Sequence, residues 1–187
     1  MVFTIKRTKD LVLIALFTAL IAAGAFIRIP VPVVPFTLQF LFTTLAGILL
    51  GAGRGALSVG CYLVLGLLGL PIFAGGGGIS YVLQPTFGYL IGFCVGAGVT
   101  GAIANRVPRP SLKRLLAANF AGLFQVYLFG MVYYWMILQF YTGTGIGFWT
   151  LFLYCFLLAV PGDIVLCITA ALLGKRLLPI LRKDGEV

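Results

Sequence analysis

A single carboxylate stands out in the C-terminal half of the chain as a group that could do chemistry. Asp163 is the only Asp, Glu, Lys or Arg between Arg114 and Lys175. The 12 residues that separate it from Lys175 cover roughly 18 Å of helix, which places the carboxyl inside a hydrocarbon core about 30 Å thick. A carboxylate there is costly unless it is paired, protonated or faces a polar cavity, so it is a candidate functional group. The alternative is a structural hydrogen bond between helices.

The surroundings of Asp163 favour binding over catalysis. Pro161 and Gly162 precede it and can loosen the helix and free backbone groups, which fits a cavity wall. Arg28, at the end of the first apolar run, could neutralise an anionic ligand or pair with Asp163, or it could be an interfacial arginine that extends its head group to water. An intramembrane enzyme using Asp163 would need a second catalytic group, and the chain has no histidine. We therefore expect no enzymatic activity.

Two uncharged segments could cover such a cavity. Residues 70–78 are apolar and end in four glycines, Gly75, Gly76, Gly77 and Gly78, which let a backbone approach a ligand closely. A plain flexible loop is the alternative, whereas a P-loop is excluded because no Lys-Ser or Lys-Thr follows. Residues 29–39 carry Pro30, Pro32 and Pro35. We expect both segments on the same side of the membrane.

The elements that must position these groups are membrane-spanning helices. The 187 residues are 61% hydrophobic and 9% charged, with a mean hydropathy of +1.15, which is far from a soluble composition. A span takes about 20 residues, so we expect an all-α integral membrane protein, a single domain over 1–187. Apolar runs between Pro and Gly breaks predict six helices, at 10–28, 38–53, 55–70, 86–105, 112–138 and 148–177.

The positions of the cations predict the topology. With six spans, one face receives Lys6, Arg7, Lys9, Arg54, Arg106, Arg109, Lys113, Arg114, Lys175, Arg176, Arg182 and Lys183, and the other receives only Arg28. The positive-inside rule then predicts that both termini are cytoplasmic. The net charge of +9 is thus explained by topology and attraction to anionic lipid, and we expect no nucleic-acid partner.

Two further features have structural interpretations. Cys61, Cys94, Cys155 and Cys167 lie in apolar runs without CxxC spacing, so we expect neither a metal nor a cofactor. Ala23-Gly24-Ala25 could imitate a signal-peptide cleavage site, but the length of the run favours a retained first helix. In that helix Ala15, Ala19 and Ala23 form a stripe of small residues that lets another helix approach, either within the bundle or in a partner.

Four motifs follow one another along nearly the whole chain: Pro32-x-x-Pro35-Phe36-Thr37-Leu38-Gln39, the run 66–76 that ends in Phe73-Ala74-Gly75-Gly76, Pro85-Thr86-x-Gly88-Tyr89, and Pro161-Gly162-Asp163. Together they resemble the motifs of the BioY family. The members of that family are the biotin-specific substrate-binding subunits (S components) of energy-coupling factor (ECF) transporters. Two departures are Leu166, where the family motif has a lysine, and Phe87, which follows Gln84-Pro85-Thr86 where a glycine is usual.

The resemblance implies an S-component bundle of six helices in the cell membrane, with both termini cytoplasmic. It implies capture of biotin from outside, in a pocket under the loops that follow the first and third helices, and delivery for uptake. It implies as partners a transmembrane coupling protein, which the Ala15, Ala19 and Ala23 stripe would contact, and two cytoplasmic ATPases. An S component for another vitamin is the alternative.

The chemistry of biotin then suggests roles for individual residues. Asp163 would accept from the ureido N–H groups, with Gln84, Asn119 or backbone N–H groups as donors to the ureido carbonyl. Arg28 or the N–H groups of Gly75 to Gly78 would bind the carboxylate. The apolar walls would be Phe36, Phe73, Tyr81 and Tyr89, and Gln39 adds a neutral polar group.

Overall fold

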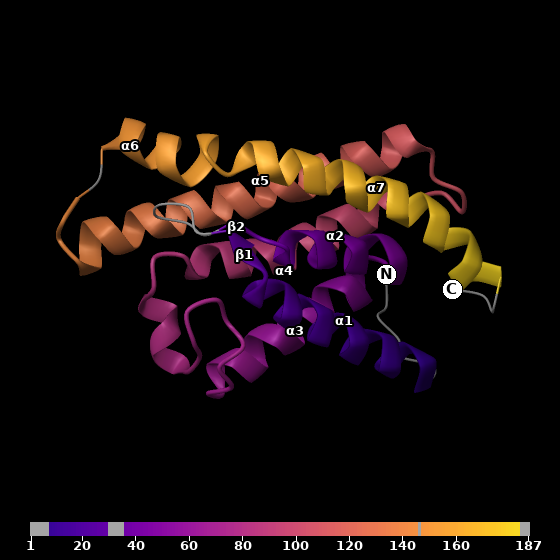
Figure 1. The fold of residues 1–187 in the computed structure, drawn as a ribbon, viewed down its shortest axis with the longest axis horizontal. Coiled ribbons are helices and arrows are strands. Elements are labelled where there is room, and N and C mark those ends of the chain that lie inside the picture. Colours follow the sequence, from indigo (N-terminus) through magenta and orange to yellow (C-terminus); the bar gives the residue numbers. More distant parts are fainter. Residues whose placement is uncertain (1–7, 30–35, 146, 184–187) are drawn as a thin grey trace.

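The computed structural model describes residues 8–29, 36–145 and 147–183, which are mostly helical (Figure 1). Pro30, Pro32 and Pro35, like Lys6 and Arg7, lie outside the described residues. The elements are α1 (Thr8–Phe26), β1 (Arg28–Ile29), β2 (Phe36–Thr37), α2 (Gln39–Leu50), α3 (Ala52–Leu67), the 3-10 helix η1 (Ile79–Leu83), α4 (Phe87–Ala104), α5 (Leu112–Met136), the π-helix η2 (Ile137–Tyr141), α6 (Phe148–Phe152), the π-helix η3 (Leu153–Leu157) and α7 (Val160–Lys183).

Each of the six predicted apolar ranges is mainly helical, but the helices differ in length, and the last range, 148–177, is divided into α6, η3 and α7 where one helix was predicted. Among the described residues, four are long and apolar enough to cross a membrane: Thr8–Phe26, Phe87–Ala104, Leu112–Tyr141 and Trp149–Leu181. The other two, α2 and α3, are apolar but shorter, with 12 and 16 residues. The prediction of an all-helical membrane protein is therefore confirmed, while the count of six spans stays a prediction.

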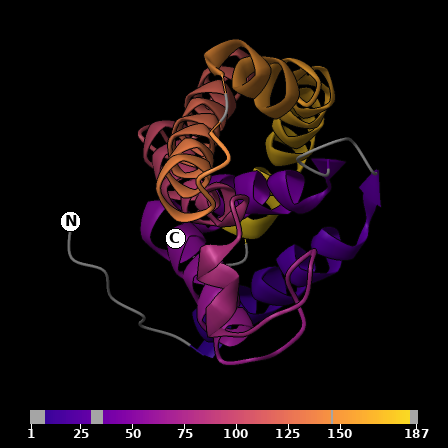
Figure 2. The same ribbon diagram turned by 90° about the vertical axis from the view of Figure 1, so that its left-hand side faces the viewer.

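The helices surround α2 and α4. Helix α2 contacts α1, α3, α4 and α7, and α4 contacts α2, α3 and α5. Helices α5, α6 and α7 run together along one side of the molecule, with α1 and α3 on the opposite side (Figures 1 and 2). The centre of the bundle is therefore built from segments far apart in the sequence.

Small residues bring the central helices into close contact. A Cβ at Gly92 of α4 would lie 2.7 Å from the Cα of Val126 in α5, and one at Gly96 would lie 2.9 Å from the carbonyl oxygen of Gly122. Such close approach is the usual way in which helices associate in lipid, where burial of apolar surface supplies little driving force. The glycines thus set the relative position of α4 and α5.

The break between α2 and α3 lies three residues earlier than the sequence predicts, at 51 and not at 54. The helices end and begin around Gly51, whose φ of 86° favours glycine. The third helix starts at Ala52, not at 55, because Gly55 is not part of the turn. A Cβ at Gly55 would lie 2.8 Å from the Cα of Gly47, so this glycine allows α2 and α3 to pack tightly.

Two ordered segments lie next to the bundle where loops were predicted. Arg28 and Ile29 pair antiparallel with Thr37 and Phe36, so the first helix ends at Phe26 and not at residue 28. In the segment after α3, the Phe73 N–H donates to the Gly76 carbonyl at 2.9 Å, and the Gly76 N–H donates back at 3.1 Å. Both segments have a defined backbone that can hold side chains in place.

Candidate ligand-binding site

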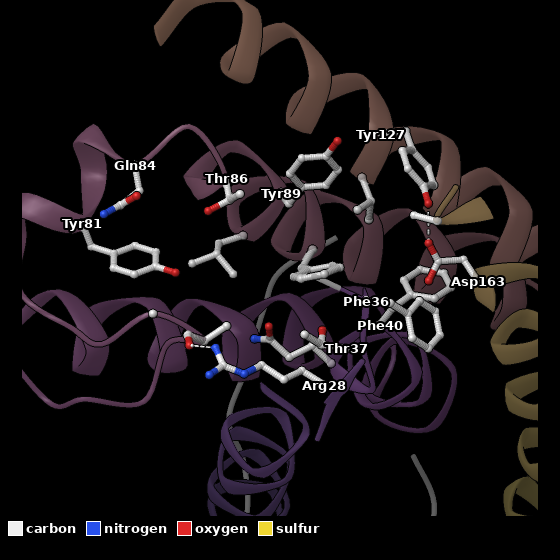
Figure 3. Close-up of a pocket in the computed structure, with 17 residues that line it drawn as sticks. Arg28, Phe36, Thr37, Phe40, Tyr81, Gln84, Thr86, Tyr89, Tyr127 and Asp163 are labelled. Carbon is white, nitrogen blue, oxygen red and sulfur yellow. Dashed lines mark hydrogen bonds between the residues drawn. The ribbon is translucent and has the colours of Figure 1, made fainter. Parts of the chain in front are cut away.

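A cavity of about 210 Å³ lies between the β1–β2 hairpin, the glycine-containing loop and helices α2, α4, α5 and α7 (Figure 3). Its lining combines aromatic rings with a few polar groups, which is typical of a small-molecule site. The lining residues are Arg28, Phe36, Thr37, Gln39, Phe40, Ala74, Gly75, Tyr81, Gln84, Thr86, Tyr89, Leu90, Phe93, Val126, Tyr127, Ala159 and Asp163.

Asp163 lies at one end of this cavity and is the only acidic residue among the described residues that line it. The hydroxyl of Tyr127, on α5, donates to its Oδ2 atom at 2.5 Å (Figure 3). Phe36 lies beside the preceding residue, because a Cβ at Gly162 would be 2.5 Å from the Phe36 ring. The carboxylate is therefore held between an α5 hydroxyl and the hairpin.

Arg28 is the only cation among the described residues in the lining. Its Nη1 atom donates to the carbonyl oxygen of Ala74 at 2.6 Å, so it links β1 to the glycine-containing loop. The sequence allows an ion pair between Arg28 and Asp163, but this pair does not form among the described residues. The ion pair found among them joins Arg54 and Asp10. The positive and negative groups of the cavity are thus separate and both face its interior (Figure 3).

Gln39 provides a buried polar group at the start of α2. Its side chain is 2% exposed and lies beside the Tyr62 hydroxyl, yet its Nε2 atom has no hydrogen-bond partner among the described residues. A buried donor without a partner is costly, and this one belongs to a residue that lines the cavity. Gln39 is therefore a candidate donor to a ligand.

Aromatic residues form most of the apolar wall. Tyr89 lies on the side of α4 that faces the cavity. Its hydroxyl donates to the carbonyl oxygen of Cys155 at 3.0 Å, and Cys155 belongs to the π-helix η3, which precedes α7. Phe40 and Phe93 pack against each other with their ring centroids 6.5 Å apart. The Tyr89 hydroxyl thus satisfies a backbone carbonyl at the interruption before α7, while the rings shield the cavity.

The structure brings eight of the predicted site residues to the cavity and leaves five outside its lining. Asp163, Arg28, Gln39, Phe36, Gly75, Tyr81, Gln84 and Tyr89 line it; Phe73, Gly76, Gly77, Gly78 and Asn119 do not. No observation here tests their contact with a ligand, so the assignments stay predictions.

The five residues outside the lining have structural contacts instead. Phe73 is 1% exposed, with its ring 4.6 Å from that of Tyr81. Gly76 and Gly78 have φ angles of 122° and 101°, and a Cβ at Gly77 would collide with the carbonyl of Leu70. These glycines therefore shape the loop itself.

Asn119 makes its contact between two helices. It is fully buried, and its Nδ2 atom donates to the carbonyl oxygen of Cys167 at 2.8 Å, which connects α5 with α7. Its Oδ1 atom has no partner among the described residues. The amide thus serves as a polar contact between helices in the bundle.

Several lining residues were not predicted, although the helical repeat could have identified some of them. Thr86, Tyr89, Leu90 and Phe93 follow the i, i+3, i+4, i+7 spacing of one helix face, so the prediction of Tyr89 implied the others. The same reasoning links Ala159 to Asp163. Thr37, Phe40 and Ala74 adjoin predicted residues, whereas Val126 and Tyr127 on α5 depend on how that helix is rotated.

The stripe of small residues on α1 lies away from the cavity. Ala15, Ala19 and Ala23 are all exposed, while Ile14, Phe17 and Ile21 of the same helix are buried. Of the two expectations, packing within the bundle and contact with a partner, the exposure favours the second. Contact between this stripe and a partner stays a prediction.

Comparison with known proteins gives consistent matches over nearly the whole chain. The model of the BioY family matches residues 2–183. A probable biotin transporter BioY from Lysinibacillus sphaericus is 46% identical over 182 residues, which cover 97% of this chain and 93% of that protein. The biotin transporter BioY of Rhizobium etli is 37% identical, with 91% and 94% covered. A crystal structure of the S-component for biotin from an ECF-type ABC transporter superposes with a TM-score of 0.79 at 29% identity, covering 99% of this chain and 96% of that chain.

Proposed function

Because the chain belongs to the BioY family, we propose that it captures biotin at the outer face of the membrane and presents it to an ECF module for uptake. The observation that carries this is the cavity itself, in which one carboxylate and one guanidinium lie apart between aromatic walls. The similar S-component for biotin supports the same assignment. We also propose that the protein binds its ligand without covalent chemistry, which is supported by relatives that are named as transporters.

The chemistry of biotin is complementary to the polar groups of the cavity. The ureido ring carries N–H groups from which Asp163 can accept, and a carbonyl that needs a donor such as Gln39 Nε2. The thiophane ring and valeryl chain suit the walls formed by Phe36 and Tyr89. The valerate carboxylate suits Arg28, because a charged hydrogen bond is roughly twice as strong as a neutral one.

The topology proposed from the sequence accommodates this site. We propose six spans in the cell membrane, with α2 and α3 as two short ones, and both termini cytoplasmic. The support is the clustering of cations at one end of the helices: Arg54 lies in the first turn of α3, Arg106 and Arg109 lie between α4 and α5, and Lys113 and Arg114 lie in the first turn of α5. The hairpin and the glycine-containing loop are then outside, where biotin arrives.

Delivery into the cell requires partners that hydrolyse ATP. We propose that the chain assembles with a transmembrane coupling protein and two cytoplasmic ATPases, and that the exposed stripe of Ala15, Ala19 and Ala23 contacts the coupling protein. Small side chains allow another helix to approach closely in lipid. The membrane lipid itself is the remaining partner.

Equilibrium binding of biotin to the purified protein in detergent tests the proposal. We expect saturable binding below micromolar biotin, no binding of thiamine or riboflavin, and a loss of about tenfold or more for Asp163→Asn and for Arg28→Gln. Biotinamide should lose the dependence on Arg28, because it lacks the carboxylate. Arg109→Gln is the matched control, since Arg109 is an exposed cation outside the cavity lining.

The results of these binding measurements distinguish biotin from another vitamin as the ligand. Absence of binding at micromolar biotin would contradict the proposed function, and saturable binding of another vitamin would indicate an S component of different specificity. Unchanged affinity in both the Asp163 and the Arg28 variants would contradict the proposed roles of these two residues.

A further inference from the structure

The hydroxyl of Tyr127 is placed to decide which oxygen of Asp163 meets a ligand. It donates to Oδ2 at 2.5 Å, and it is the hydrogen-bond partner that the structure gives this carboxylate among the described residues. A carboxylate has two oxygens that both accept hydrogen bonds. With Oδ2 already accepting from α5, Oδ1 is the oxygen of this carboxylate to which the structure gives no hydrogen bond among the described residues, and it is the less hindered acceptor for a ligand in the cavity.

The Tyr127 side chain has little freedom to leave this position. It is 4% exposed, and its ring contacts two others edge to face, that of Tyr89 at 6.1 Å and 87° and that of Phe156 at 5.0 Å and 71°. Its helix is fixed against α4 where Gly92 and Gly96 allow close contact. The hydroxyl is therefore preorganised before any ligand binds.

The opposite side of the acid is also occupied. Phe36 lies over Gly162, immediately before Asp163 in α7, and it lines the same cavity. The acid thus lies between a hydrogen-bond donor on α5 and an aromatic ring on β2 (Figure 3). Arg28, the cation of the lining, donates to Ala74 and not to this carboxylate. Tyr127 is accordingly the group that can orient it.

We propose that Tyr127 is a positioning residue, which holds Asp163 so that Oδ1 faces the cavity as an acceptor and makes the site selective for a ligand that presents an N–H donor there. This inference rests on the proposed function, in which biotin supplies that donor through its ureido ring. Tyr127 acts through Asp163 and needs no contact with biotin of its own.

A double-mutant cycle tests this role through the size of the coupling. A carboxylate can only accept from the Tyr127 hydroxyl, as it does at Oδ2, whereas the amide of Asp163→Asn can either accept from this hydroxyl or donate to it. In the asparagine variant the hydroxyl therefore no longer fixes which atom faces the ligand. We expect Tyr127→Phe to weaken biotin binding about tenfold in the wild-type background and clearly less in the Asp163→Asn background.

A ligand analogue supplies a second measurement, which does not require the weakly binding Asp163→Asn variants. Biotin methylated at the ureido nitrogens cannot donate, so the preference of the wild-type protein for biotin over this analogue measures the N–H contact. We expect Tyr127→Phe to reduce that preference by about tenfold. Tyr133→Phe is the control, because Tyr133 is on the same helix, donates to the backbone carbonyl of Val82, and lies outside the cavity lining.

The results separate this inference from the proposed function. If wild-type protein fails to bind biotin, the proposed function fails first. If wild-type protein binds and Tyr127→Phe keeps the full affinity and preference, or if the double variant is weaker than Asp163→Asn by the same factor as in the wild-type background, the positioning role is wrong. Additivity of that kind would show that Tyr127 acts only on packing.

Discussion

A methyl group added at Gly162 should disturb the cavity through the ring of Phe36. The Cβ of an alanine there would lie 2.5 Å from Phe36 Cε2, 2.9 Å from Cζ and 3.0 Å from Cδ2. Carbon atoms in contact are about 3.5–4.0 Å apart, so the ring must move by about 1 Å. Phe36 lines the cavity, so its displacement should cost the ligand one packing contact. We therefore expect Gly162→Ala to weaken biotin binding about tenfold.

The expected change in stability is smaller because two effects oppose each other. Alanine is favoured over glycine within a helix by about 1 kcal/mol, and Gly162 belongs to α7. Overpacking against a ring costs about 1–3 kcal/mol. The net destabilisation should therefore be about 0–2 kcal/mol, which shifts the thermal midpoint by a few degrees at most. Binding should change more clearly than the midpoint, as measured by calorimetric titration and by thermal unfolding in the same detergent.

A matched variant and a rescue make this prediction refutable. Gly60 also lies within a helix, α3, but a Cβ there meets nothing within 4 Å, so Gly60→Ala should leave the affinity for biotin unchanged. Phe36→Leu, which gives the added methyl group room, should make Gly162→Ala less harmful than it is alone. Wild-type affinity in Gly162→Ala, or equal losses in both glycine variants, would refute the assigned contact.

Three further predictions concern residues outside the cavity lining. Ala19→Trp should leave the affinity of the purified protein for biotin unchanged, because Ala19 is exposed on α1, but should abolish biotin uptake by cells that also produce the ECF module; normal uptake would argue against contact through this stripe. Gly66→Ala should lower the free energy of unfolding by about 1–3 kcal/mol, because the new Cβ would collide with the buried ring of Phe73; a thermal midpoint equal to wild type would contradict this. Asn119→Ala should lower it by a similar amount, about 1–3 kcal/mol, because the hydrogen bond to the carbonyl of Cys167 is lost, and unchanged unfolding would show that this bond is dispensable.

The fold class followed from the sequence because it depends on composition and on order along the chain. Long apolar runs can hide their backbone polar groups only as helices, and each of the six predicted ranges is mainly helical. The observed helix boundaries differ from the predicted ones where glycines have different structural roles. Gly51 ends a helix, whereas Gly55, four residues later, allows two helices to touch, and both look alike in the sequence.

The candidate site was predictable only in part, because each of its groups depends on the others. Asp163 could be found alone, since its cost in a membrane is independent of its neighbours. Its partner could not, because Asn119 and Tyr127 both face inward from α5. Which of them reaches the acid depends on how α5 lies against α7, where Asn119 meets Cys167 and Tyr127 meets Asp163.

The sequence by itself determined that the chain is a helical membrane protein with one isolated acid, because hydropathy and charge are properties of single segments. The tertiary structure decided which residues share the cavity with that acid. It placed Gly75 in the lining and its three glycine neighbours outside it, and it separated Arg28 from Asp163. These outcomes depend on close helix contacts and loop hydrogen bonds between residues far apart in the chain, which no local pattern encodes.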